Sequence, residues 1–134
     1  MLQFIYSTRV YYEDTDAIGI VYHANYLKFF ERARVEGFRE QGYLLKDLLE
    51  HHNTQFVVHS LSIKFLLPAY LDQLLYIVTT VAEVNFASIR YNQKAYLDSK
   101  EGSILCEADI RVACINSQHQ VRRLPEFLVG EFKK

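Results

Sequence analysis

The hydrophobic residues of this chain follow two different spacings, one early and one later in the sequence. Between residues 25 and 41 they recur every three or four positions, which predicts a helix with one buried face. Between residues 56 and 114 they mostly recur every second position, which predicts strands of a sheet with one solvated face. The apolar face of the expected helix consists of Tyr26, Phe29, Phe30, Ala33, Gly37 and Phe38.

The second spacing divides into several strands, and shorter patterns add two short helices. One face of the second strand is expected to carry Val57, Leu61, Ile63, Phe65 and Leu67, and one face of the last strand Ile104, Cys106, Ala108, Ile110, Val112 and Cys114. Short helices are expected in Leu44–Glu50 and Pro125–Phe132. The expected strands are Phe4–Tyr12, Phe56–Leu67, Leu74–Val84, Ser88–Leu97 and Ile104–Cys114. Because the aromatic helix has nothing else to pack against, we expect an α+β fold in which an antiparallel sheet wraps around one long central helix, as a single domain over residues 1–134.

Composition narrows the class of protein. Half of the 134 residues are apolar and 23% are charged, a balance typical of globular proteins. The formal net charge of −1 does not indicate a nucleic-acid-binding protein, which would carry an excess of basic residues. No apolar run approaches the ~20 residues of a membrane span. The N-terminus does not read as a signal peptide, so we expect a cytoplasmic protein. Cys106 and Cys114 are expected to be reduced core residues that hold no metal.

The candidate chemistry is concentrated in a polar turn between the first strand and the long helix. This turn carries Glu13, Asp14, Asp16 and His23. A carboxylate beside a helix N-terminus suits acid–base chemistry, because free backbone amides there stabilise developing negative charge. The chain has no GxSxG, GxGxxG or P-loop motif. A metal site at the adjacent His51 and His52, expected in a loop, is disfavoured because ligand spacing is missing.

The segment from Tyr11 to Arg34, YYEDTDAIGIVYHANYLKFFERAR, resembles a known family. It is similar to the hot-dog-fold acyl-CoA thioesterases of the 4-hydroxybenzoyl-CoA thioesterase type, and most closely to the bacterial branch associated with the Tol–Pal cell-envelope system. The resemblance places the catalytic role on Asp16, as general base on a water or as nucleophile. It gives the backbone N–H of His23 the role of polarising the thioester carbonyl, and it makes the His23 side chain and Tyr12 further candidates.

The resemblance also implies the reaction and the assembly. The expected substrate is an acyl-CoA with a short aliphatic or an aromatic acyl group, hydrolysed without metal or organic cofactor. We expect a homo-oligomer, a dimer or a homotetramer, with sites at the subunit interface, and acyl carrier protein is a further candidate partner. The pattern departs from the family at Ala17 and Ile18, where an apolar residue precedes the glycine.

Several alternatives stay open at this point. Asp14 and Asp16 would also suit a purely structural role, accepting backbone hydrogen bonds in the turn. Glu31 on the helix is expected to form a surface ion pair with Arg34 rather than to catalyse. The main rival function is a non-catalytic or acyl-carrier-protein-directed acyl-binding subunit in envelope-lipid metabolism. A hot-dog dehydratase or hydratase is disfavoured because the acidic cluster precedes the helix, and an aspartyl-phosphate phosphatase because the chain is short and its later half antiparallel.

Overall fold

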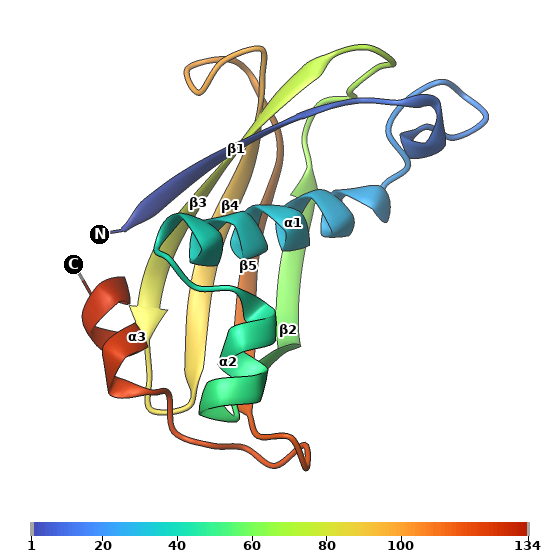
Figure 1. Cartoon of the computed structure of the whole chain (residues 1–134). Helices are drawn as coiled ribbons and strands as arrows, with labels where there is room; N and C mark the ends of the chain where they lie inside the picture. The colour runs from blue at the N-terminus through green and yellow to red at the C-terminus, as the bar shows by residue number, and fades with distance from the viewer. Residues whose placement is uncertain (1, 134) are drawn as a thin grey trace.

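The computed structural model describes residues 2–133, and its elements follow the order expected from the two spacings (Figure 1). One strand precedes a long helix and a short one, and four strands and a short closing helix follow. The elements are β1 (Gln3–Arg9), the single 3-10 turn η1 (Tyr12–Asp14), α1 (Asn25–Glu40), α2 (Leu45–His52), β2 (Gln55–Phe65), β3 (Leu74–Val84), β4 (Ser88–Leu97), β5 (Ile104–Ile115) and α3 (Glu126–Phe132).

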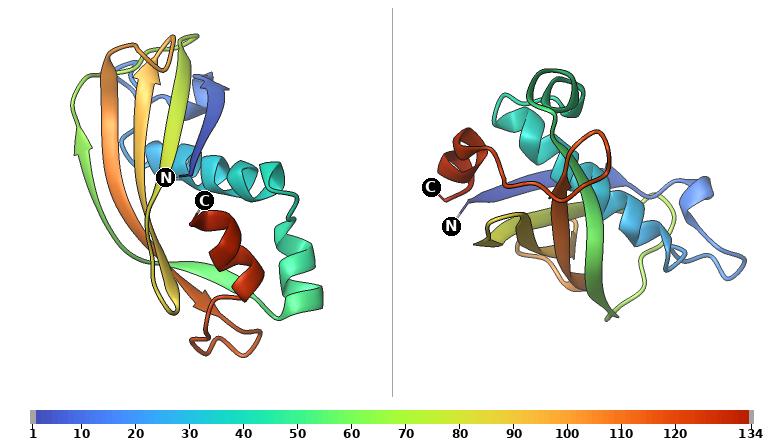
Figure 2. Two further views of the ribbon diagram at one scale, coloured as in Figure 1. Left: turned by 90° about the vertical axis from the view of Figure 1, so that its left-hand side faces the viewer. Right: turned by 90° about the horizontal axis from the view of Figure 1, so that it is seen from below.

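The five strands form one antiparallel sheet in the order β1-β3-β4-β5-β2. The sheet curves around α1, and α2 and α3 lie on the same side of it (Figure 2). This arrangement confirms the expected α+β fold with one central helix. Among the described residues, no helix combines the length and the hydropathy needed to cross a membrane.

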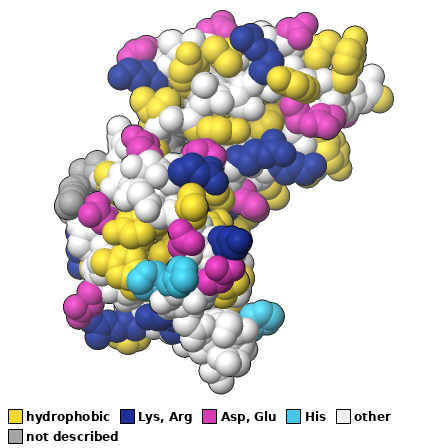
Figure 3. Space-filling view, viewed as in Figure 1, with side chains coloured by type: hydrophobic (Ala, Val, Ile, Leu, Met, Phe, Trp, Pro, Cys, Tyr) yellow, Lys and Arg dark blue, Asp and Glu magenta, His cyan; other side chains and the backbone are white. Residues whose placement is uncertain are grey.

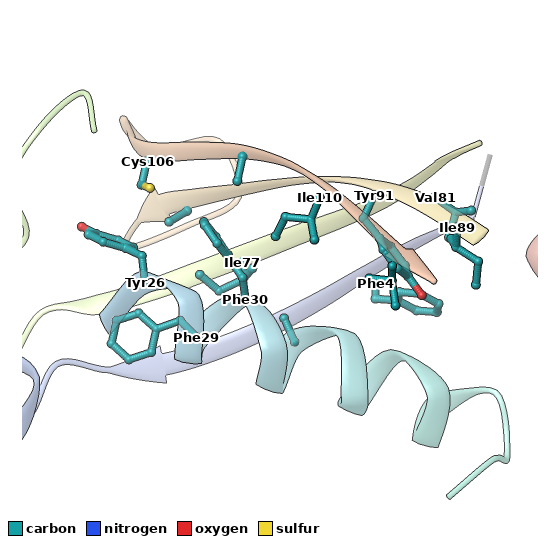
Figure 4. Packing of buried hydrophobic residues seen from close by; sticks show 14 of the residues in the cluster. Phe4, Tyr26, Phe29, Phe30, Ile77, Val81, Ile89, Tyr91, Cys106 and Ile110 are labelled. Carbon is teal, nitrogen blue, oxygen red and sulfur yellow. The ribbon is translucent and has the colours of Figure 1, made fainter. Parts of the chain in front are cut away.

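The core lies between α1 and the concave face of the sheet (Figure 4). Phe29 and Phe30 of α1 are fully buried, as are Ile77 of β3 and Ile89 of β4. The aromatic stripe of the helix therefore packs where the spacing predicted. Cys106 and Cys114 are free and buried, as expected.

The first strand ends earlier than predicted. Tyr12 was expected in the strand, but β1 stops at Arg9 and Tyr12 opens the 3-10 turn. The Tyr11 N–H donates to Asp14 Oδ2 at 2.9 Å, so the side chain of Asp14 turns the backbone away from the sheet. As a result, the Tyr12 side chain is 82% exposed.

A β-bulge in β2 overturns part of the expected strand face. The register with β5 shifts between Val58 and Ser60, so His59 is the extra residue. Directly paired residues of neighbouring strands share a face, and one extra residue inverts the alternation. Val57 therefore faces away from α1 and not with Leu61. The residues of β2 on the helix side are Phe56, Val58, Leu61, Ile63 and Phe65, and Leu67 lies beyond the strand.

A second bulge corrects the expected face of β5. Ala95 pairs with Cys106 but Tyr96 pairs with Ile104, so Leu105 is the extra residue. Ile104 consequently shares a face with Tyr96 on the outside of the sheet, whereas Leu105 is buried. A prediction from strict alternation assumes that no residue is inserted. The prediction that Ile104 shares the buried face of β5 was wrong for that reason.

Gly37 of α1 lies against the side chain of Phe4 in β1. A Cβ atom on Gly37 would lie 2.6 Å from Cδ2 of the buried Phe4 ring, which itself packs against Phe132. We expect Gly37→Ala to destabilise the fold by about 1–2 kcal/mol, because overpacking outweighs the better helix propensity of alanine. Urea unfolding of the two proteins would measure this difference.

Gly130 provides the matched control, because it also lies in a helix, α3, but has no atom within 4 Å of an added Cβ. Gly130→Ala should be neutral or should stabilise the fold by about 0.5–1 kcal/mol. Equal effects of the two substitutions would show that contact with Phe4 does not decide the outcome.

Candidate functional site

The polar turn between β1 and α1 is held together by the buried Asp14. Its Oδ2 accepts the Tyr11 N–H at 2.9 Å, and its Oδ1 accepts a hydrogen bond from Asn25 Nδ2 at 2.7 Å. Its backbone oxygen accepts the Tyr22 N–H at 2.9 Å. Asp14 therefore links the end of β1 to the start of α1, which confirms the structural role considered for it.

Asp16 lies at the mouth of the same turn and is half-buried. A bridge between Thr15 and Val21 closes the turn, and Gly19 takes the positive φ of 87° that its geometry requires. The Ile18 N–H donates to Asp16 Oδ1 at 3.0 Å, which fixes the carboxylate. Within residues 2–133, nothing donates to Oδ2 of Asp16. One oxygen is thus held in place while the other is available for chemistry.

The N-terminus of α1 presents backbone amides that remain available. The amides of Asn25, Tyr26 and Leu27 donate to carbonyls three residues earlier. For the amides of His23 and Ala24, the part of the chain that the structure describes offers no acceptor. Amides at a helix start carry the positive end of the helix dipole, so these two form a natural site for an oxyanion.

The side chains of His23 and Tyr12 are both exposed. The centre of the His23 ring lies 4.6 Å from that of Tyr22, with the rings tilted by 53°, and it meets the ring of Phe65 edge-on at 5.9 Å. Tyr12 lines a shallow hollow with Arg9 and Asp72. Its hydroxyl forms no hydrogen bond with Asp16 in the described part of the chain. The structure thus gathers Asp16 and His23 on the turn and helix start, while Tyr12 projects to one side.

Other candidates from the sequence are used elsewhere. Burial raises the pKa of the Cys106 thiol to about 12 and that of Cys114 to about 11, so neither suits a nucleophile. His51 and His52 end α2 and do not lie in a loop. Side chains of His51, Asp47 and Glu50 lie close enough together for a cation, but all three are exposed.

By charge alone, Lys64, Arg90, Arg122 and Arg123 are candidates for contact with the nucleotide phosphates of coenzyme A. Arg90 forms ion pairs with Glu83 and Asp109, and Arg123 pairs with Glu126. Arg122 donates to the backbone oxygens of His52 and Asn53 at the end of α2. These three arginines therefore have structural partners, and Lys64 is an exposed residue of β2.

The burial of Arg34 was not predicted from the sequence. The residue was expected in a surface ion pair with Glu31, but it is 9% exposed and donates to Gln93 Oε1 at 2.9 Å. The signal was present in the spacing, because Arg34 follows Phe30 by four residues and directly follows Ala33 on the apolar face. Glu31 itself is exposed, and no ion pair joins it to Arg34 among the described residues.

Hydrophobic side chains surround the site. In Figure 3 they are exposed where the polar turn projects from the fold, at the upper right. The exposed ones of this region include Ile18, which is 78% exposed, and Tyr22, which is 48% exposed. Along β2, Val58, Leu61 and Phe65 are each more than 40% exposed although they face the helix side of the sheet.

Comparison with known proteins adds independent information. The sequence pattern of the thioesterase-like superfamily matches residues 10–132. The chain is 44% identical to the acyl-CoA thioesterase YbgC of Haemophilus influenzae over 113 residues, which cover 84% of this chain and 81% of that protein. It is 37% identical to the acyl-CoA thioester hydrolase YbgC of Escherichia coli O6:H1 over 132 residues, 98% of this chain and 96% of that one. A 1,4-dihydroxy-2-naphthoyl-CoA thioesterase from Synechocystis shares the fold, with a TM-score of 0.89 at 19% identity, covering 99% of this chain and 97% of that chain.

Proposed function

Since this chain belongs to the thioesterase-like superfamily, we propose that it hydrolyses acyl-CoA thioesters with Asp16 as the carboxylate that activates the attack. The products are a free acid and coenzyme A. The observation that carries the proposal is the geometry of the turn: Asp16 keeps one oxygen free, and α1 begins on the same turn with two available amides. The expectation of an acyl-CoA thioester hydrolase agrees with the names of the relatives.

The free oxygen of Asp16 supports two forms of the attack. As a general base it would take a proton from a water that adds to the thioester carbonyl carbon. As a nucleophile it would form a mixed anhydride and release the coenzyme A thiolate, and water would then hydrolyse the anhydride. In both forms the C–S bond breaks and the thiolate takes up a proton. In single-turnover hydrolysis in ¹⁸O-labelled water, an unlabelled product acid would identify the nucleophile route, because water that attacks the Asp16 carboxyl carbon of the anhydride releases the acid with the original Asp16 oxygen and leaves the label on Asp16.

The amides of His23 and Ala24 would stabilise the oxyanion that forms on the thioester carbonyl. Hydrogen bonds to a developing charge at a helix N-terminus strengthen in the transition state, and loss of one such donor typically lowers the rate by about 10²–10³-fold. The exposed His23 ring is suited to orient water or to protonate the leaving thiolate. Tyr12 is a candidate wall of the acyl pocket, because its ring is exposed beside the turn.

The acyl group would lie along a path between α1 and β2, and we call this proposed path the α1–β2 groove. It begins where Phe65 packs 5.9 Å from the rings of both His23 and Tyr26. It ends where Phe56 packs 5.0 Å from Phe38. The groove therefore starts beside the proposed oxyanion site. Short aliphatic and aromatic acyl groups both remain candidates for its entrance.

A second subunit would complete this groove. β2 is an 11-residue edge strand with one side unpaired, and its helix-side residues are exposed and apolar. Long apolar edges of this kind are usually covered, and a symmetric homodimer covers two at once. We therefore propose a homodimer joined along β2, with pairing of dimers into a homotetramer as an extension, and a cytoplasmic location that suits two free cysteines.

Light scattering tests this assembly. The wild-type protein should have the mass of a dimer or tetramer, and Leu61→Glu, which puts a charge into the apolar edge, should shift it to a monomer with low activity. Phe86→Glu is the control, because Phe86 is 72% exposed in the β3–β4 turn, away from β2. A fully active monomeric wild type would contradict the proposal.

Release of thiol from a panel of acyl-CoAs, with short, long and benzoyl acyl groups, tests the function itself. Turnover of at least one member is the expected result. A correctly assembled oligomer that binds acyl-CoA without turnover would instead support an acyl-binding subunit. Activity only on acyl carrier protein would move the substrate to that carrier.

A further inference from the structure

A cavity of about 330 Å³ lies between the second half of α1 and the start of β2, where the proposed acyl path ends. Most of its wall is apolar and includes Phe38, Phe56 and Val58. Three polar side chains, Glu31, Arg34 and Tyr91, also line it. The cavity thus differs from an ordinary hydrophobic pocket, because charged groups and a hydroxyl share its wall.

Arg34 brings a buried positive charge to this cavity. The residue is 9% exposed, and its guanidinium forms one hydrogen bond, to Gln93 Oε1. Gln93 is itself fixed, because its Nε2 donates to the backbone oxygen of Phe30 and to Thr79 Oγ1. No carboxylate pairs with Arg34 within residues 2–133. A guanidinium carries five donors, so most of its capacity is unused.

The unused donors of Arg34 are accessible from the cavity. Among the described residues, the hydroxyl of Tyr26 is the one fully buried side-chain polar atom without a partner. Nitrogens of Arg34 that lack a partner must therefore retain contact with open space, and the cavity is the space that Arg34 lines. A buried guanidinium is stabilised when an oxygen acceptor completes its hydrogen bonds.

Tyr91 points into the same space. Its residue is 2% exposed, and its ring extends from β4 toward α1 (Figure 4). The Tyr91 hydroxyl has no hydrogen-bond partner in the described chain and, by the same reasoning as for Arg34, is accessible only through the cavity. Arg34 and Tyr91 thus offer one oxygen atom a charged donor and a hydroxyl that donates or accepts.

We propose that this cavity binds the distal end of the acyl group and selects acyl groups that carry an uncharged oxygen there, as a hydroxyl or keto group. Glu31 at the rim opposes the charge of Arg34, so the three side chains sum to no net charge and an acyl carboxylate has no advantage over a hydroxyl. The inference rests on the proposed function, because it takes the thioester to lie at Asp16.

The reach of the groove sets the size of the acyl group. Eleven residues separate His23 from Arg34, which corresponds to about 16 Å along the axis of α1. Helical side chains lean toward the N-terminus of the helix, so the guanidinium lies closer than that to the thioester. Short aliphatic acyl groups would end before it. Medium-length chains and extended aromatic acyl groups would reach it.

The test compares pairs of substrates that differ only by the distal hydroxyl. The pairs are decanoyl-CoA with ω-hydroxydecanoyl-CoA, and cinnamoyl-CoA with p-coumaroyl-CoA. The wild-type oligomer should show a kcat/KM at least about tenfold higher for the hydroxylated member of one pair or both, as expected for a hydrogen bond to a charged group. Non-hydrolysable thioether analogues of the same four acyl groups give the corresponding ratio of Kd values.

Two variants assign the preference to the cavity. Tyr91→Phe keeps the ring and removes the hydroxyl, and it should reduce the ratio; Arg34→Met should abolish it. Arg34→Met also leaves Gln93 Oε1 without its donor. If Arg34→Met fails to fold for this reason, Tyr91→Phe alone still tests the proposal. Tyr96→Phe is the matched control, because Tyr96 lies on the outer face of the same strand, and its ratio should equal that of the wild type.

The possible results separate the two proposals. Hydrolysis of all four substrates with equal kcat/KM within each pair, or a preference that survives both variants, would overturn the role of the cavity and leave the thioesterase intact. Hydrolysis of none of the four, together with no turnover of the acyl-CoA panel, would overturn the proposed function. The Kd ratio of the thioether analogues would then still decide whether the cavity recognises a distal hydroxyl.

Discussion

Asp16→Asn is expected to lower kcat on acyl-CoA by about 10²–10⁴-fold while leaving the fold and the oligomer unchanged. An amide has no basic oxygen to take a proton from water, and it is a poor nucleophile. It does retain a carbonyl oxygen that accepts the Ile18 N–H, so the turn keeps its hydrogen bond. The measurement is thiol release on the best acyl-CoA of the panel, with light scattering and thermal unfolding of both proteins.

Glu13→Gln is the matched control for this experiment. Glu13 is an exposed carboxylate in the same turn, three residues before Asp16, and the substitution likewise exchanges an acid for its amide. It should retain wild-type activity. If Asp16→Asn turns over as fast as the wild type, the proposed mechanism is wrong and the catalytic carboxylate lies elsewhere.

Asp14→Ala, unlike Asp16→Asn, should lower the stability of the fold. The buried carboxylate accepts hydrogen bonds from the Tyr11 N–H and from Asn25 Nδ2, and alanine would leave both donors without a partner. Hydrogen bonds to a charged acceptor contribute about 1.5–3 kcal/mol each. We therefore expect the free energy of unfolding to fall by about 3 kcal/mol, measured by urea denaturation.

The comparison with Asp14→Asn sharpens this prediction. Asparagine keeps one oxygen acceptor, so it should recover part of the loss. Since Asp14 shapes the turn that carries Asp16, kcat should also fall in Asp14→Ala, but the loss of stability distinguishes it from Asp16→Asn. An Asp14→Ala protein as stable as the wild type would show that these hydrogen bonds do not hold the turn.

Much of this fold follows from local patterns. The limits of β3 and β4 were predicted to the residue, because each is a run of alternating residues between clear turn signals. The start of α1 at Asn25 was also predicted, and its end differed by one residue. In these segments burial on one face dominates, and the spacing of apolar residues records burial directly.

The errors arise where a contact between distant residues overrides the local pattern. Asp14 ends β1 early through its side chain, and the bulges at His59 and Leu105 depend on the register with neighbouring strands. Arg34 looks like a surface residue until Gln93, 59 positions away, is seen to accept its hydrogen bond. The spacing of apolar residues along the chain cannot predict such contacts, because it records only local burial.

The residue types of the candidate site could be predicted from the sequence. Which of Asp14 and Asp16 is structural could be predicted only in part. Both stand in the same turn and suit the same roles by chemistry alone. Burial separates them, because Asp14 uses both oxygens for structure and Asp16 uses one. The assignment of catalysis to Asp16 and His23 stays a prediction that the experiments above address.

The bulge at His59 matters to anyone who wishes to re-engineer the groove. Because the inserted residue inverts the alternation, the residues that face α1 are even-numbered before it, as in Phe56 and Val58, and odd-numbered after it, as in Leu61 and Ile63. A mutant library that changes only even-numbered or only odd-numbered residues along all of β2 would alter the face toward α1 on one side of His59 and the outer face of the sheet on the other side. Deleting His59 would exchange the two surfaces of one half in a single step, which makes one codon the shortest route to a new groove lining.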